Sequence, residues 1–183
     1  DGAALVANWR WLAAQSGGAA CGAAVKADGY GLGAREVVDR LRAAGCRDFF
    51  VSTWAEADAL MPWAEGASLS VLHGAGPDDM AAALASPARP VLNSAGQVAR
   101  WRQTGRPCDV MVDTGINRLG LTVAEATSGL LEGLAIETLM SHLACADEQS
   151  SMNEFQRTAF ATLADKVDAR RLSLANSAGI CLG

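Results

Sequence analysis

Residues 24–33 read AVKADGYGLG. They follow a small-residue apolar run at 21–25 that predicts a strand, and they precede an amphipathic pattern over 34–43 that predicts a helix. Lys26 is therefore expected at the carboxyl end of a strand, which is where α/β folds bind their ligands. A lysine there can be a nucleophile toward carbonyl groups or a base in proton transfer. By position alone, a lysine that merely extends into solvent is an equal alternative.

The glycines after Lys26 allow a second interpretation. Gly29, Gly31 and Ala34 match G-x-G-x-x-A, the pattern that binds a dinucleotide when it opens a helix after a strand. That pattern also requires an acidic residue at the end of the second strand, about 20 residues on. Residues 51–53 stand there and read Val-Ser-Thr, without a carboxylate. The fingerprint is half present, and it leaves a nicotinamide-dependent enzyme as an alternative.

Outward from this segment, short apolar runs alternate with helical patterns. The predicted strands cover 21–25, 49–51, 69–72, 91–92, 109–112, 136–140 and 171–175. The predicted helices cover 4–15, 34–43, a stretch opened by the capping-box pattern at 53–56, one that begins at Pro77, one capped by Asn93 or Ser94, 122–132 and 152–166. Repeated strand–helix units predict an α/β fold with a parallel sheet and right-handed crossovers.

The length of these units suits a (β/α)8 TIM-type barrel, which typically takes about 250 residues. The chain has 183 residues, and its seventh predicted strand lies close to the end. We therefore expect one domain over residues 1–183, an incomplete barrel that stops where an eighth strand would start. An open doubly wound sheet shows the same alternation and is the competing architecture.

The composition excludes several classes of function. The net charge is −5 and the 15 basic residues are scattered, which argues against binding to nucleic acid or a membrane surface. No apolar stretch approaches the roughly 18 residues that span a bilayer, and no secretory signal is visible. The five cysteines form no Cys-x-x-Cys pair, so we expect reduced thiols and a cytoplasmic protein. With two histidines, we expect no metal site.

Two later strand ends carry candidate functional residues. Residues 113–120 read DTGINRLG and place Arg118 in a loop between glycines, where its fork of donors can bind an oxyanion or a carboxylate. Residues 141–148 read SHLACADE and place His142 at the edge of a strand. A surface arginine in a turn and a hydrogen-bonded structural histidine are the plainer alternatives.

The last predicted strand ends at residues 175–179, which read ANSAG. Asn176, Ser177 and the free N–H groups of a helix start can form a cradle for a phosphate. The same NSAG string occurs at 93–96, where we expect only a helix cap.

The segment AVKADGYGLG resembles the pyridoxal-phosphate lysine motif of bacterial alanine racemases. The segments DTGINRLG, SHLACADE and ANSAG resemble later signatures of the same family, and they occur in the same order. The resemblance covers essentially the whole chain and implies a (β/α)8 barrel rather than an open sheet.

The resemblance also implies roles for individual residues. Lys26 takes the position of the lysine that forms the internal aldimine with pyridoxal 5′-phosphate. Tyr30 matches the tyrosine that contacts the phosphate. Arg118 matches the arginine that contacts the cofactor's phenolic oxygen and lies near the substrate carboxylate.

His142 matches a histidine of the hydrogen-bond network beside the pyridine ring, and Asn176 and Ser177 match residues on the phosphate side. One departure concerns Met111, which stands where many members carry a carbamylated lysine that supports the arginine. Without that support, Arg118 must be oriented in another way or held less firmly.

The implied activity is the interconversion of L-alanine and D-alanine, through a carbanion that the cofactor stabilises, to supply D-alanine for peptidoglycan. In the family, the lysine serves one face of Cα and a tyrosine from the C-terminal β domain of the partner subunit serves the other. That β domain is absent from this sequence, so we expect a homodimer for the full-length protein and little turnover by this chain alone. A non-catalytic fragment that binds pyridoxal phosphate and a related serine racemase are the alternatives.

Overall fold

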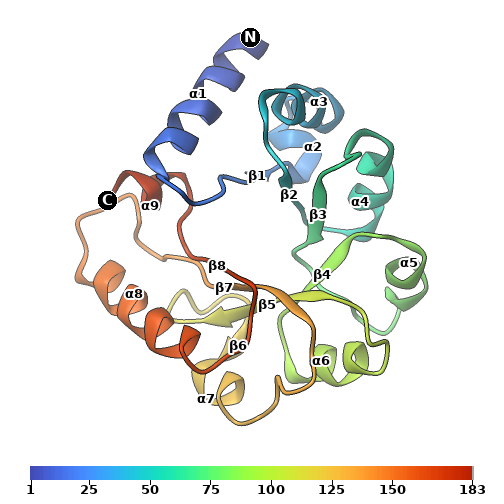
Figure 1. The fold of residues 1–183 in the computed structure, drawn as a ribbon, viewed down its shortest axis with the longest axis vertical. Helices are drawn as coiled ribbons and strands as arrows, with labels where there is room; N and C mark the ends of the chain where they lie inside the picture. Colours follow the sequence, from blue (N-terminus) through green and yellow to red (C-terminus); the bar gives the residue numbers. More distant parts are fainter. Residues whose placement is uncertain (183) are drawn as a thin grey trace. The chain divides into compact units, whose positions relative to one another are not determined.

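The computed structural model describes residues 1–182, which divide into two compact units, residues 1–90 and residues from 91 onward. Figure 1 shows the repeated alternation of strands and helices along the chain in both units. Among the described residues, no helix combines the length and the apolar character that crossing a membrane requires.

In the first unit, consecutive strands lie side by side and run parallel. These strands are β1 (Ala23–Ala24), β2 (Asp48–Val51), β3 (Ser68–Val71) and the first half of β4 (Arg89–Leu92). The helices are α1 (Gly2–Gln15), α2 (Lys26–Tyr30), α3 (Ala34–Ala44), α4 (Trp54–Leu60), the 3-10 helix η1 (Met61–Trp63) and α5 (Met80–Ala85).

Helix α3 forms where the sequence predicts it because its apolar residues recur at helical spacing. Its buried side chains are Ala34, Val37, Val38 and Leu41. The helix ends at Gly45, whose φ of 115° is favourable only for glycine. The sequence therefore specifies both the buried face of this helix and its end.

Pro77 does not begin a helix, contrary to the prediction. Residues 77–79 form a turn, and α5 begins at Met80. The Asp79 side chain accepts a hydrogen bond from the Gly76 N–H at 2.8 Å. This hydrogen bond between Asp79 and the earlier residue Gly76 closes a turn, and the helix begins only after it.

The second unit continues the same parallel order. It contains the second half of β4, then β5 (Cys108–Asp113), β7 (Ile136–Met140) and β8 (Arg171–Ser173), each paired with the next. The helices are α6 (Ala95–Arg102), α7 (Val123–Ala126), α8 (Ser151–Ala164) and α9 (Ser177–Cys181).

The segment after β5 differs most from the prediction. A short strand β6 (Leu121–Thr122) pairs with the end of β5, and the helix expected over 122–132 is reduced to the four residues of α7. The Thr127 hydroxyl donates to the Val123 carbonyl at 2.9 Å, which favours an end to the helix there. Gly129 then adopts a positive φ of 87°, and residues 127–133 form turns instead.

The strand order decides between the two architectures. In both units each strand of the main path neighbours the next strand in the chain, giving β1-β2-β3-β4-β5-β7-β8 with β6 beside β5. A doubly wound sheet reverses its order at a switch point, and a (β/α)8 barrel does not. The chain therefore has the βα topology of a (β/α)8-type barrel with seven successive strands, as the sequence predicts.

Candidate functional site

The segment around Lys26 has an uncommon backbone conformation. Strand β1 ends at Ala24, and residues 27–30, directly after Lys26, form one turn of left-handed helix, with φ values of 51° at Ala27, 51° at Asp28 and 57° at Tyr30. Each non-glycine residue in this conformation costs roughly 1–2 kcal/mol. Such a turn persists only where the surrounding structure holds it in place.

Hydrogen bonds from backbone N–H groups to two carboxylates hold this turn. The Asp28 carboxylate accepts from the Ala34 N–H at 2.8 Å, which joins the turn to the start of α3. The Glu56 carboxylate accepts from the Ala27 N–H at 2.8 Å, which joins the turn to α4. The peptide group next to Lys26 is therefore held from outside its own segment.

The two candidate side chains on this turn are available to a ligand. Lys26 is half-buried, and within residues 1–90 its ammonium has no hydrogen-bond or ion-pair partner. The Tyr30 side chain is 64% exposed, and its hydroxyl has no partner in the same unit. A free amine and a free phenol thus lie within five residues of each other at the end of β1.

In the second unit, the loop after β5 is organised by Asp113. Its carboxylate accepts hydrogen bonds from the N–H groups of Gly115, Asn117 and Arg118 at 2.8, 3.1 and 3.2 Å. The Arg118 side chain is exposed, and its guanidinium has no partner among residues 91–182. Asp113 therefore fixes the backbone and leaves the guanidinium free.

Met111 and Gly120 meet at the base of this loop. Met111 is buried on β5, and a Cβ added to Gly120 would lie 3.1 Å from the Met111 Cγ and 2.6 Å from the Asp113 nitrogen. The side chain of Met111 thus makes an apolar contact beside the Arg118 loop, where many members of the family that the sequence resembles carry a supporting lysine. In this chain the hydrogen bonds of Asp113 orient the loop.

A buried glutamine on α8 connects the ends of β5 and β7. The Gln156 amide donates to the Thr114 hydroxyl at 3.1 Å and to the His142 carbonyl at 3.0 Å, and it accepts from the Ala144 N–H at 2.8 Å. The Thr114 hydroxyl also bonds to the Ser141 hydroxyl at 2.7 Å. The structure thereby brings together the loops that carry Arg118 and His142.

Gln156 and Asp113 were not predicted from the sequence as residues of the site. A signal for Gln156 exists, because it shares a helical stripe with the buried residues Phe160 and Leu163. A polar residue on the buried face of an amphipathic helix needs hydrogen-bond partners there.

Both NSAG strings cap helices. The Asn176 side chain accepts from the Gly179 N–H at 2.8 Å at the start of α9, and the Ser94 hydroxyl accepts from the Gln97 N–H at 3.4 Å at the start of α6. A Cβ on Gly179 would lie 3.0 Å from the Leu143 Cδ1, so this glycine allows α9 to approach the loop that carries His142. Ser177 is exposed beside it, and its role stays a prediction.

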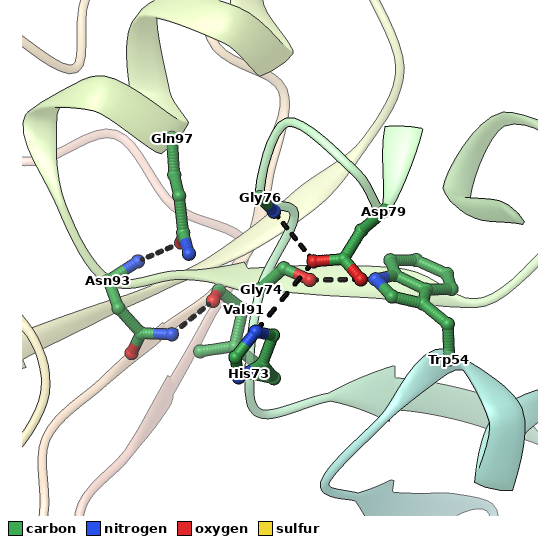
Figure 2. A network of polar contacts seen from close by, with 8 residues as sticks. All are labelled: Trp54, His73, Gly74, Gly76, Asp79, Val91, Asn93 and Gln97. Carbon is green, nitrogen blue, oxygen red and sulfur yellow. Dashed lines mark hydrogen bonds and ion pairs between the residues drawn. The ribbon is translucent and has the colours of Figure 1, made fainter. Parts of the chain in front are cut away.

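A further loop follows β3. The Trp54 indole donates to the Gly74 carbonyl at 2.8 Å, and the Asp79 carboxylate lies 3.7 Å from the His73 Nε2. Figure 2 shows both contacts. Asp79 also accepts from the Gly76 N–H. These contacts stabilise the loop, and we interpret the buried Trp54 as a residue with a structural role.

Metal and thiol chemistry find little support among residues 1–182. No group of three or more His, Cys, Asp or Glu residues there could hold a metal ion. All five cysteines are free thiols. Burial raises the pKa of the Cys46 thiol to about 11, which disfavours the reactive thiolate.

The candidate residues therefore form two sets. Lys26 and Tyr30 lie on one turn of the first unit, and Arg118, His142, Asn176 and Ser177 lie at successive strand ends of the second. An unpartnered amine suits covalent attachment of an aldehyde, and an unpartnered guanidinium suits an oxyanion. The first set thus suits an aldehyde, and the second set suits an oxyanion such as a phosphate or a phenolate.

Comparisons with known proteins agree with this chemistry. Residues 1–183 match the family described as "Alanine racemase, N-terminal domain". The chain is 43% identical to an alanine racemase of Acidiphilium cryptum and 41% identical to a catabolic alanine racemase of Mesorhizobium japonicum, in each case over 100% of its length. It covers 54% and 51% of those two proteins, so it spans about half the length of the curated relatives that it matches.

Among solved structures, the chain is similar to an alanine racemase of Bartonella henselae with covalently bound pyridoxal phosphate. The TM-score is 0.92 at 34% identity, and the match covers 100% of this chain and 55% of the other. A histidine racemase from Leuconostoc mesenteroides matches at a TM-score of 0.83 and 21% identity, which shows a shared fold alone.

Proposed function

The chain belongs to the alanine racemase family, and from that premise we propose that it is the cofactor-binding part of a pyridoxal 5′-phosphate-dependent alanine racemase. The observation that carries the proposal is the half-buried ammonium of Lys26, which has no partner within residues 1–90 and lies beside a strained turn at the end of β1. Family membership also favours this function over a nicotinamide-dependent enzyme that would use Gly29 and Gly31.

Each candidate residue has a role in this proposal. Lys26 holds the cofactor through its amine, and the Tyr30 hydroxyl, Asn176 and Ser177 bind on the phosphate side. The Arg118 guanidinium binds the phenolic oxygen and lies near the alanine carboxylate, and His142 belongs to the hydrogen bonds around the ring. When bound, pyridoxal phosphate supplies an electron sink that stabilises negative charge at the substrate Cα.

The Lys26 amine also moves a proton. When its amine is unprotonated and not attached to the cofactor, the Lys26 Nζ would take the proton from Cα of D-alanine, or return it there. The opposite face of Cα needs a second base. In our proposal that base lies outside residues 1–183, in the partner subunit of a homodimer.

The biological setting is also part of the proposal. The five free thiols support a reducing cytoplasm, and the activity supports a supply of D-alanine for peptidoglycan. A catabolic use of alanine is the alternative role, since two of the relatives are catabolic alanine racemases. Serine is the competing substrate, and racemisation of each amino acid at equal concentration distinguishes the two.

The decisive test uses the two lysines of the sequence, Lys26 and Lys166. Addition of pyridoxal phosphate followed by borohydride reduction is expected to label Lys26, as measured by peptide mass mapping, with a visible absorbance band before reduction. The Lys26→Ala variant is expected to lose both signals. Lys166 is exposed after the end of α8, so Lys166→Ala is the matched control and should keep them. A band that survives in Lys26→Ala would refute the assignment.

A further inference from the structure

The two carboxylate oxygens of Glu56 accept hydrogen bonds from different segments of the chain. The Oε2 atom accepts from the Ser52 and Thr53 N–H groups at 2.6 and 3.1 Å, which is the usual capping-box contact at the start of α4 with one additional donor. The Oε1 atom accepts from the Ala27 N–H at 2.8 Å, across a sequence separation of 29 residues. The second contact has no part in capping the helix.

The Ala27 N–H belongs to the peptide group that joins Lys26 to Ala27. Because a peptide group is planar, a hydrogen bond that fixes this N–H also fixes the ψ angle of Lys26. That angle sets the path of the chain at the point where the lysine side chain leaves it. Glu56 thus acts on the Lys26 amine through one peptide group.

The turn needs such a contact. Ala27, Asp28 and Tyr30 all have positive φ values, which L-residues adopt at a cost. The remaining hydrogen bonds of the turn, such as Gly29 N–H to Val25 and Gly31 N–H to Ala27, come from its own segment. The Phe50 carbonyl accepts from the Val25 N–H just before the turn, and within residues 1–90 Glu56 is the one residue outside segment 22–34 that bonds to residues 27–30 themselves.

We propose that Glu56 is a positioning residue that holds the Lys26 turn in the left-handed conformation required for attachment of the cofactor. The inference rests on the proposed function, because it takes Lys26 as the residue of attachment. A bond to a charged acceptor is stronger than a neutral one, which suits it to hold a strained turn.

Glu125 offers a matched control for the substitution of Glu56. Glu125 forms a second capping box with Thr122 at the start of α7, and its Oε2 accepts from the Thr122 N–H at 2.8 Å and from the Thr122 hydroxyl at 2.9 Å. Its Oε1 has no such long-range contact among residues 91–182. Glutamine is accepted at this position of a capping box, so a Gln substitution preserves both caps.

The two substitutions therefore differ in one contact. In Glu56→Gln the side-chain oxygen can stay with Ser52 and Thr53, and the amide NH2 then faces the Ala27 N–H, where two donors repel. In Glu125→Gln no contact outside the cap is lost. Thermal unfolding is expected to show a larger loss of stability in Glu56→Gln than in Glu125→Gln, because only Glu56→Gln loses a hydrogen bond outside its cap.

The experiment measures the rate of borohydride-trapped labelling of Lys26 by pyridoxal phosphate, and separately the hydrogen exchange of the Ala27 amide by NMR. We expect Glu56→Gln to slow labelling about tenfold and to expose the Ala27 amide to exchange, because one charge-assisted hydrogen bond is lost. Glu125→Gln should match the wild type in both measurements.

The outcomes separate the two proposals. If the wild type labels Lys26 and Glu56→Gln behaves as Glu125→Gln does, the positioning role is wrong and the proposed function stands. If the wild type does not label Lys26, the proposed function fails, and the Ala27 amide still shows whether Glu56 holds the turn. Faster exchange at Ala27 with unchanged labelling also overturns the inference, because the turn would then be irrelevant to attachment.

Discussion

At the scale of single residues, Gly120 shows how closely the loop that carries Arg118 is packed. Its φ of 130° is rarely adopted by L-residues, and an added Cβ would lie 2.6 Å from the Asp113 nitrogen and 2.9 Å from the Val112 carbonyl carbon. Both neighbours are backbone atoms of β5, so the contact cannot be relieved by turning a side chain. The loop can follow this path only with glycine at this position.

The Gly120→Ala substitution is expected to lower the free energy of unfolding by more than about 2 kcal/mol, because strain and steric overlap add. Gly105 also has a positive φ, of 63°, but nothing lies within 4 Å of an added Cβ. Gly105→Ala should therefore cost only about 1 kcal/mol of backbone strain. Urea denaturation measures both values, and equal costs would contradict the packing argument.

Cys46 predicts a dependence of stability on pH. Burial raises the pKa of its thiol to about 11 from an ordinary value of 9.0. Below pH 9 the thiol is protonated in both the folded and the unfolded chain. Between pH 9 and 11 the unfolded thiol ionises while the folded thiol stays protonated, so the unfolded state binds fewer protons and stability falls as pH rises.

Replacement of Cys46 by alanine removes this ionisation. The difference in unfolding free energy between wild type and Cys46→Ala should stay constant from pH 7 to 9 and then shrink toward pH 11. Urea denaturation at pH 8 and pH 10.5 measures it. A difference that does not change with pH would show that the folded thiol ionises normally.

At the scale of elements, helix α8 supplies the contact that joins two strand ends. The Gln156 side chain has 0% exposure, and its amide bonds to groups at the ends of both β5 and β7. Without that amide, the Thr114 hydroxyl, the His142 carbonyl and the Ala144 N–H would each lose a buried partner. Helix α8 therefore connects the ends of β5 and β7 through the hydrogen bonds of Gln156, in addition to packing its apolar side chains.

The Gln156→Met substitution keeps the length of the side chain and removes its polar atoms. We expect it to cost about 3 kcal/mol or more of stability, because buried polar groups lose their hydrogen bonds. We also expect faster hydrogen exchange in the 141–148 loop. The same change at the exposed residue Gln103 is the control and should cost less than about 0.5 kcal/mol. A small cost at both sites would show that water replaces the amide.

At the scale of the whole molecule, the sequence has a single tyrosine, Tyr30, and the proposal places it at the phosphate. The chain then has the Lys26 amine as its one base at the substrate Cα. A racemase needs a proton donor and a proton acceptor on opposite faces of Cα, so one base alone supports exchange at one face.

We therefore expect the purified chain, loaded with pyridoxal phosphate, to exchange the Cα proton of D-alanine for deuterium in D2O without producing L-alanine at a comparable rate. Proton NMR follows the exchange, and chiral chromatography follows the racemisation. The Lys26→Ala variant should show neither reaction. Rapid racemisation by the chain alone would refute the assignment of the second base to a segment outside it.

Local features could be predicted from the sequence because both partners lie within a few residues. The capping box of Thr53 and Glu56 is a contact at a spacing of three, and the buried stripe of α3 with its end at Gly45 follows from helical periodicity. The alternation of strands and helices, and with it the α/β class, depends on the same local patterns.

The sequence by itself thus determined the order of the seven main strands, the strand ends that carry Lys26, Arg118 and His142, and the resemblance to a family. The tertiary structure alone decided the left-handed turn at Ala27, the second contact of Glu56 and the network of Gln156. These contacts join residues 29 and 42 positions apart, and their formation depends on which strand ends adjoin in the folded chain. Spacing along the chain encodes short-range hydrogen bonds, but it carries no information on a partner that only the packing of parallel strands brings within reach.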